Sequence, residues 1–204
     1  AMEAFAGAVY WMPGVGDGTF GPAQLIQEGT GVDGRFGQGL EVADVDGDGS
    51  LDILAAYGSY DDAVPNASDE GAIWIGYGDG VGGFPASDLL VGLPGAGGSR
   101  QILVEDVDLN GQQDVIRGSF SFTNGEYYEG ATLIHLATGV RSFDSAPKAI
   151  ETNLSQSNPD AGLVSGDFDQ DSLPELVVGI FGSDVLTQDG GEVYIYSACE
   201  GLPF

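Results

Sequence analysis

The sequence predicts an all-β fold made of tandem four-stranded antiparallel sheets. Two observations carry this prediction. First, the 204 residues contain 35 scattered glycines, a composition that suits many tight turns and disfavours long helices. Second, an acidic motif and its flanking landmarks recur with starts 62 and 61 residues apart, and self-similarity at a fixed period is typical of repeat architectures.

The repeat is marked by the acidic stretch DVDGDGSLD at 44–52, which recurs as DVDLNGQQD at 106–114 and as DFDQDSLPE at 167–175. Two further landmarks keep the same period. The stretches GAVYW, GAIWI, GATLI and GEVYI begin at Gly7, Gly71, Gly130 and Gly191, and matching phenylalanines stand at Phe20, Phe84 and Phe143. Three landmarks in one period indicate a true repeat.

Each period is interpreted as four short strands, because β-branched and aromatic residues alternate with other residues between turn signals. In the first full unit we expect strands at 39–43, 51–57, 72–77 and 86–91. Repeated sheets of this kind are the blades of a β-propeller.

We expect one domain over 1–204, divided into a partial blade at 7–30, blades at 31–92 and 93–152, and an incomplete blade at 153–204. Because propellers usually close with about four to eight blades, about three blades predict a partial or open propeller. It is interpreted as a piece of a larger propeller, an open stack, or a ring completed by a second copy.

The formal net charge of −27 comes from 32 acidic residues against 5 Lys and Arg. Such a charge repels nucleic acids and anionic membranes and attracts cations. Adaptation to a salty medium would produce the same composition, so composition leaves both interpretations open. No apolar run approaches a membrane-spanning length, and we expect no membrane insertion.

The acidic stretch places oxygen atoms at alternate positions, which is the pattern that a hard cation such as Ca²⁺ requires. Side chains at positions 1, 3, 5 and 9 and the backbone carbonyl at position 7 are the predicted ligands. They are Asp44, Asp46, Asp48, the carbonyl of Ser50 and Asp52 in the first loop; Asp106, Asp108, Asn110, the carbonyl of Gln112 and Asp114 in the second; and Asp167, Asp169, Asp171, the carbonyl of Leu173 and Glu175 in the third. The sequence therefore predicts three Ca²⁺ sites.

The loops differ in detail. The second has one carboxylate fewer, which predicts weaker binding. In the third, Ser172 replaces the glycine found at Gly49 and Gly111, so this turn must form without glycine's conformational freedom.

Two alternatives compete with the Ca²⁺ sites. An EF-hand requires a bidentate Glu at position 12 and flanking helices, but position 12 is Ala55, Arg117 and Val178. Three acidic turns that bind nothing are the other alternative, because Asp, Asn and Gly are ordinary turn formers. The preserved alternation in all three copies favours cation binding.

The segment RFGQGLEVADVDGDGSLDILAAYG, at 35–58, resembles the FG-GAP repeats of integrin α-subunit propellers and of many bacterial surface and secreted proteins. It carries the Phe36-Gly37 pair, the cation loop, and AYG where that family often has Gly-Ala-Pro. The later units keep the loop but lose the Phe-Gly pair. The resemblance implies a propeller whose calcium ions rigidify the turn between the first two strands of a blade, with partners bound on the opposite face.

That opposite face is expected from 58–70, 120–130 and 181–190, because alternate connections of an antiparallel blade lie on the same side. The predicted partner-binding residues are its aromatics: Tyr60, Phe122, Tyr127, Tyr128 and Phe181. Exposed aromatics with polar neighbours are typical of protein or sugar recognition. The alternative is that these rings pack loop against loop.

Three functions are compatible with this pattern. The first is an extracellular calcium-stabilised module for adhesion or for protein or glycan recognition. The second is an enzyme, which we do not expect, because His135 lies within a strand, Cys199 lies near the end, and neither belongs to a recognisable catalytic constellation. The third is a spacer or self-assembling repeat of a larger surface protein, since open blade edges invite pairing.

Overall fold

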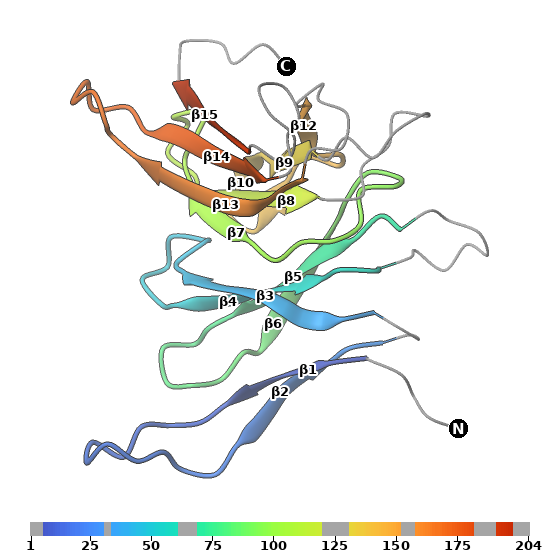
Figure 1. The fold of residues 1–204 in the computed structure, drawn as a ribbon. Coiled ribbons are helices and arrows are strands. Elements are labelled where there is room, and N and C mark those ends of the chain that lie inside the picture. The colour runs from blue at the N-terminus through green and yellow to red at the C-terminus, as the bar shows by residue number, and fades with distance from the viewer. Residues whose placement is uncertain are drawn as a thin grey trace.

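The computed structural model describes residues 6–30, 34–60, 69–119, 131–151, 158–181 and 191–197. Over these ranges the regular structure consists of β-strands and contains no helix, which confirms the predicted all-β class. The strands form antiparallel sheets that stack one on another in chain order (Figure 1). No helix in the described part of the chain has the length and apolar composition needed to cross a membrane.

The stack begins with a two-stranded hairpin and continues with three larger sheets, which we call blades A, B and C. The N-terminal hairpin pairs β1 (Ala8–Trp11) with β2 (Gln24–Glu28). Blade A has the order β3 (Phe36–Ala43), β4 (Asp52–Tyr57), β5 (Ala72–Tyr77) and β6 (Ala86–Val91).

Blade B repeats this order with β7 (Ile102–Glu105), β8 (Asp114–Ser119), β9 (Ala131–His135) and β12 (Lys148–Glu151). A small hairpin of β10 (Ala137–Gly139) and β11 (Ser142–Phe143) interrupts it between β9 and β12. Blade C contains β13 (Asn158–Gly166), β14 (Glu175–Phe181) and β15 (Glu192–Ser197).

The strands expected in the first full unit are present in blade A. β5 and β6 match their predicted ranges, and β4 begins one residue later than expected. β3 begins at Phe36 rather than at residue 39, because a register irregularity between Phe36 and Leu40 adds a bulged start to the strand. Gly37 occupies this bulge with φ 81°, a conformation open to glycine at little cost.

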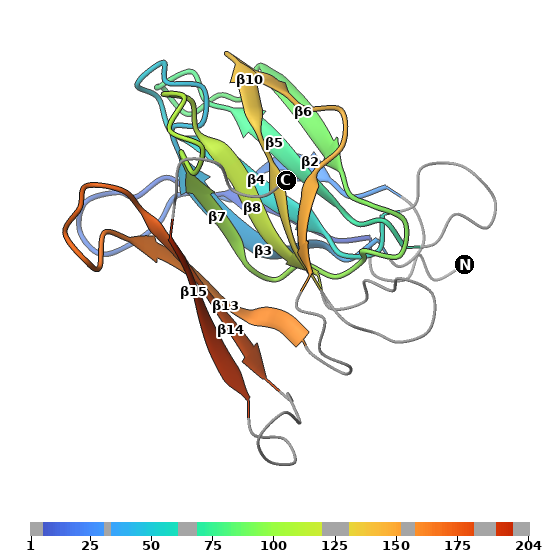
Figure 2. The same cartoon turned by 90° about the horizontal axis from the view of Figure 1, so that it is seen from above.

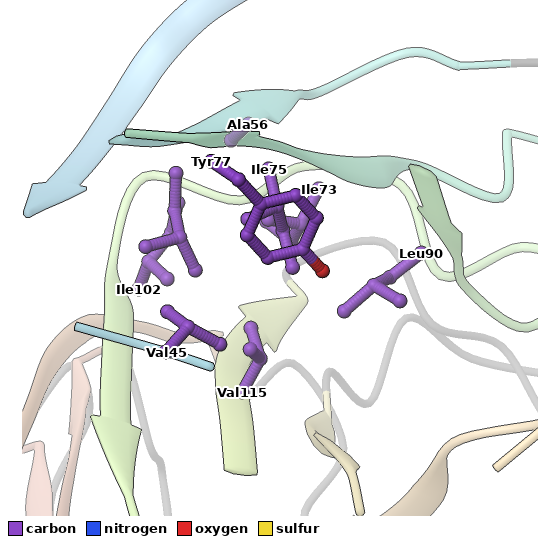
Figure 3. Packing of buried hydrophobic residues seen from close by; sticks show 9 residues of the cluster. Val45, Ala56, Ile73, Ile75, Tyr77, Leu90, Ile102 and Val115 are labelled. Carbon is purple, nitrogen blue, oxygen red and sulfur yellow. The ribbon is translucent and has the colours of Figure 1, made fainter. Parts of the chain in front are cut away.

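The core lies between the sheets. In β8, Val115 packs with the cluster shared by blades A and B, whereas its neighbour Ile116 packs with the cluster shared by blades B and C. Successive side chains of a strand point to opposite faces, so a blade covered on both sides needs apolar residues at every position. Figure 3 shows Ile73, Ile75 and Tyr77 of β5 facing Val115 across the A–B junction.

Arg117 fixes the same junction with polar contacts. Its side chain is fully buried, and its two terminal nitrogens donate hydrogen bonds to the carbonyls of Ala96 at 3.2 Å and of Glu70 at 2.8 Å. A Cβ at Gly92 would collide with this guanidinium. The arginine therefore holds the segments on either side of blade A's second hairpin in place.

Candidate metal centres in three acidic loops

The three acidic stretches connect β3 to β4, β7 to β8 and β13 to β14. In Figure 1 the β3–β4 and β13–β14 loops lie on the same side of the stack as the β1–β2 and β5–β6 turns. This arrangement follows from the antiparallel order of each blade. It agrees with the expectation that the acidic loops share one face.

Each loop gathers three carboxylates whose oxygens lie within 4.8 Å of one another. The groups are Asp44, Asp46 and Asp48; Asp106, Asp108 and Asp114; and Asp167, Asp169 and Glu175. Nine of the predicted ligands are thus brought together. Asp52 and Asp171 are not members of these groups, and Asn110 stands beside the second one as a hydrogen-bond partner of Asp108.

The three loops share one hydrogen-bond pattern. The N–H at position 6 donates to the carboxylate at position 1, over 2.9 Å from Gly49 to Asp44, and the matching bonds measure 2.8 and 3.1 Å in the second and third loops. The N–H groups at positions 5 and 7 donate to the side chains at positions 3 and 5. These bonds are Asp48 to Asp46, Ser50 to Asp48, Asn110 to Asp108, Gln112 to Asn110, Asp171 to Asp169 and Leu173 to Asp171. The loops therefore have the same fold despite their different sequences.

Two positions of every loop have left-handed backbone conformations. At position 6, Gly49 and Gly111 have φ of 87° and 85°, and Ser172 reaches 74°. At position 4, Leu109 and Gln170 have φ of 60° and 65° where the first loop has a glycine. Non-glycine residues in this region cost roughly 1–3 kcal/mol each and persist where the surroundings impose them. The loop shape is thus kept even without glycine.

The carboxylate at position 9 is a buried clamp. Asp52, Asp114 and Glu175 are at most 3% exposed, and each accepts a hydrogen bond from the N–H at position 2 of its loop, at 2.9, 3.0 and 2.7 Å. In the first two loops the second oxygen accepts the N–H of Gly78 or Ala137, just beyond the third strand of the blade. The clamp joins the acidic loop to its own sheet.

Burial raises the pKa of Asp114 to about 6, and the neighbouring charges of Asp108 and Asp106 act in the same direction. Burial also raises the pKa of Asp52, again with two loop carboxylates adding to the effect. Burial, with a smaller contribution from the neighbouring negative charges, thus disfavours the charged forms of these two carboxylates. A bound cation would reverse that preference.

The donor set fits a hard cation. Asp44 Oδ1 and Glu175 Oε1 are buried and lack a hydrogen-bond partner, and a buried oxygen left in this state is costly. Both residues belong to the carboxylate groups described above. Because all candidate donors are oxygens, the loops suit Ca²⁺ or Mg²⁺ better than ions that prefer nitrogen or sulfur.

Of the predicted partner-binding residues, Tyr60 is the one whose side chain the structure describes. It packs edge to face on Tyr57, with ring centroids 5.7 Å apart, and lines a cavity of about 340 Å³ with Trp74, Gln27 and Asp88 among its neighbours. Phe181 is the last residue of β14. The remaining three predicted residues, Phe122, Tyr127 and Tyr128, lie outside the described residues.

His135 lies in the core between blades A and B. It is 1% exposed and pairs with Val115 across the sheet. Burial lowers its pKa to about 3, and the nearby charge of Arg117 acts in the same direction. Its imidazole is therefore neutral at ordinary pH. Cys199 lies outside the described residues.

Comparison with known protein families finds a match to the N-terminal part of the chain. Residues 4–55 match the family model of the FG-GAP-like repeat. This segment is similar to an FG-GAP-like repeat. The match spans the N-terminal hairpin, β3 and the first acidic loop, and it confirms the resemblance found in the sequence. No curated protein matches the chain.

The geometry extends beyond the segment that matches the FG-GAP-like repeat. The second and third acidic loops lie outside residues 4–55, yet they share the hydrogen bonds and left-handed positions of the first. Blades B and C therefore repeat the same structural unit with more divergent sequences. The sequence predicted these loops but not the contacts of Arg117, which reach residues 21 and 47 positions away in the preceding part of the chain.

Proposed function

We propose that the protein is a calcium-binding FG-GAP-like module in which Ca²⁺ stabilises the blades, and that it serves adhesion or recognition outside the cell. The observation that carries the calcium proposal is the same hydrogen-bonded loop, found three times, with three carboxylates converging in each. A bound cation would offset the mutual repulsion of the three carboxylates, which the backbone N–H groups of the loop offset only in part.

The ion would act on blade stability. Asp44, Asp46 and Asp48 would supply oxygens in the first loop. In the other two loops the converging carboxylates are those of positions 1, 3 and 9: Asp106, Asp108 and Asp114, and Asp167, Asp169 and Glu175. In the first two loops the position-9 carboxylate already ties the loop to the end of the third strand, so fixing the loop also fixes the sheet. Ca²⁺ bound to the folded state alone adds about 2.7 kcal/mol per site when present at about 100 times its Kd.

The deciding experiment is a calorimetric Ca²⁺ titration of chelator-stripped protein, followed by thermal melts with and without Ca²⁺. We expect two or three sites and a raised Tm, with the second loop binding most weakly because Asn110 replaces a carboxylate. Asp46→Asn should weaken one site. No heat of binding and an unchanged Tm would contradict the proposal.

Asp79→Asn provides a matched control. Asp79 lies in the β5–β6 turn, where its Oδ1 accepts the N–H groups of Val81 and Gly83. It is an acidic turn residue outside the three carboxylate groups. This variant removes the same charge as Asp46→Asn, and its calcium titration should match that of the unmodified protein.

The recognition part of the proposal is supported by the cavity at Tyr60. Aromatic walls from Tyr57, Tyr60 and Trp74 stand beside the polar groups of Gln27 and Asp88. Apolar rings with a few hydrogen-bonding groups are the composition of small-ligand sites, and this volume lies at the lower end of their range of about 300–1,000 Å³. Such a site suits a sugar unit of a glycan.

A glycan-array measurement with and without Ca²⁺ tests recognition. Tyr60→Ala should abolish binding, whereas Tyr10→Ala, at an exposed tyrosine of the N-terminal hairpin, should not. Equal binding by the two variants would contradict a site at Tyr60. The proposal assigns no catalytic role to any residue.

A self-assembling or spacer role is the second candidate, favoured by the outer face of blade C. Val164, Val193 and Ile195 on this face are 53%, 68% and 63% exposed. On blades A and B, the apolar side chains of the corresponding face are covered by the next sheet. Light scattering over a range of concentrations tests this role: a constant monomer mass would contradict self-assembly.

A further inference from the structure

Arg141 connects blade B to the first acidic loop of blade A. It lies in the turn between β10 and β11, and this hairpin stands beside β6 of blade A (Figure 2). Its Nε donates a hydrogen bond to Oδ2 of Asp46 at 2.5 Å, and its Nη2 lies 3.6 Å from Oδ2 of Asp48. The contact joins residues 95 positions apart.

The guanidinium is held from a second direction by Tyr77. Its central carbon lies 4.3 Å from the centre of the tyrosine ring, within the range of a cation–π interaction. Tyr77 is itself buried, and its hydroxyl donates to Asp88 at 2.9 Å. The arginine is therefore positioned by the fold, unlike a long side chain that meets a carboxylate by chance on the surface.

The pair is also partly withdrawn from water. The side chain of Asp46 is 1% exposed, whereas those of Arg141 and Asp48 are 37% and 41% exposed. Exposed salt bridges contribute little, but a buried carboxylate that loses its partner is strongly destabilising. Asp46 thus depends on a positive charge, and Arg141 supplies one without any metal.

Asp46 and Asp48 also belong to the first group of converging carboxylates. We propose that Arg141 is a built-in counter-ion of the first loop, which ties blade B to this loop and sets its calcium affinity below the value that its carboxylates alone would give. The inference rests on the proposed calcium binding.

Arg141 lowers the calcium affinity of the first loop by two effects. The guanidinium repels a divalent ion bound to the same carboxylates. It also stabilises the calcium-free loop, and a ligand must then displace or share an interaction already made. Removing Arg141 should therefore tighten calcium binding at the first loop and destabilise the calcium-free protein.

The test compares Arg141→Gln with Arg35→Gln and Arg141→Lys. Arg35 precedes β3, at the opposite end of the strand from the acidic loop, so Arg35→Gln removes the same charge far from the site. Arg141→Lys keeps the charge but loses the planar group that rests on Tyr77. Calcium titrations and chelator melts are measured for all three variants and the unmodified protein.

We expect Arg141→Gln to bind calcium at one site about five- to tenfold more tightly, at the lower end of the change that coupled sites typically show, and to melt at a lower temperature in chelator. Arg35→Gln should bind like the unmodified protein, and Arg141→Lys should lie between the two. If Arg141→Gln unfolds without calcium, its affinity is measured by competition with a chelator from the calcium-loaded state.

Two results would overturn the inference, and they differ. In the first, the unmodified protein binds calcium and Arg141→Gln binds it equally well or more weakly. This result would contradict the role of Arg141 and leave the proposed function intact. An unmodified protein that binds no calcium would overturn both.

Discussion

Asp52 and Gly78 are 26 residues apart, and the carboxylate of Asp52 accepts the backbone N–H of Gly78 at 2.9 Å. The other oxygen of Asp52 accepts the N–H of Val45, so one buried side chain holds the acidic loop against the end of β5. Asp114 makes the same connection in blade B, to Val107 and Ala137. The first two acidic loops are thus parts of their sheets and not appended turns.

Asp52→Asn should destabilise the protein by about 1–3 kcal/mol even in chelator. An amide offers one acceptor oxygen where two N–H groups now point, so one buried donor loses its partner. Urea unfolding of calcium-free protein measures the change. The same substitution at Asp79 is the control, and equal stabilities for the two variants would contradict the clamp.

Leu109→Gly should stabilise the protein by up to about 1 kcal/mol. Leu109 has φ of 60° and is half exposed, so glycine relieves left-handed strain with little loss of packing. Thermal unfolding is the measurement. Leu51→Gly is the matched control, because this exposed leucine of the first loop is not among the residues with positive φ; this variant should lose stability, and the opposite ranking would contradict strain at Leu109.

His135 should make the protein sensitive to acid. Its pKa is about 3 in the folded state against 6.5 for the free group, so the unfolded state binds more protons between these values and stability is lost as the pH falls below about 6.5. The slope for one group approaches about 1.4 kcal/mol per pH unit. His135→Gln should remove this loss of stability. The measurement is the free energy of unfolding against pH, in chelator, for the variant and for the unmodified protein. Parallel curves from pH 7 to 5 would show that His135 does not titrate in this way.

Arg117→Lys should cost about 2–4 kcal/mol. A lysine ammonium cannot reproduce the fork that reaches the carbonyls of Ala96 and Glu70 together, and a buried charge with fewer partners is costly. Denaturant unfolding measures the loss of stability. Arg35→Lys is the control, and it should leave the stability unchanged. A loss below about 0.5 kcal/mol would mean that the buried guanidinium does not hold the junction.

Local signals in the sequence predicted most of blade A. The ranges of β5 and β6 follow from apolar runs bounded by glycine-rich turns, and the three acidic loops follow from their alternating oxygens. The early start of β3 could not be predicted, because the bulge at Gly37 has no distinct local pattern. The β10–β11 hairpin was also missed, since strands of three and two residues are too short to show a period.

Contacts between blades could not be predicted from the sequence. The adjacent apolar residues Val115 and Ile116 of β8 indicate that both faces are buried but not which blade covers each. Arg141 and Asp46 meet only because blade B is stacked on blade A, and a lone arginine after a Gly-Val pair carries no local signal of that meeting. Tyr60 was identified as an aromatic of its loop, but its packing on Tyr57 depends on the folded sheet.

The clusters around Val115 and Ile116 each contain residues from two neighbouring sheets. One sequence repeat therefore does not contain a complete hydrophobic core. A single period cut from the chain would expose an apolar face on either side and lose its core altogether. A whole period added or removed would keep apolar faces paired with apolar faces. The architecture should therefore tolerate changes in length by complete periods better than cuts within them, as expected for a chain of repeats coupled only to their neighbours.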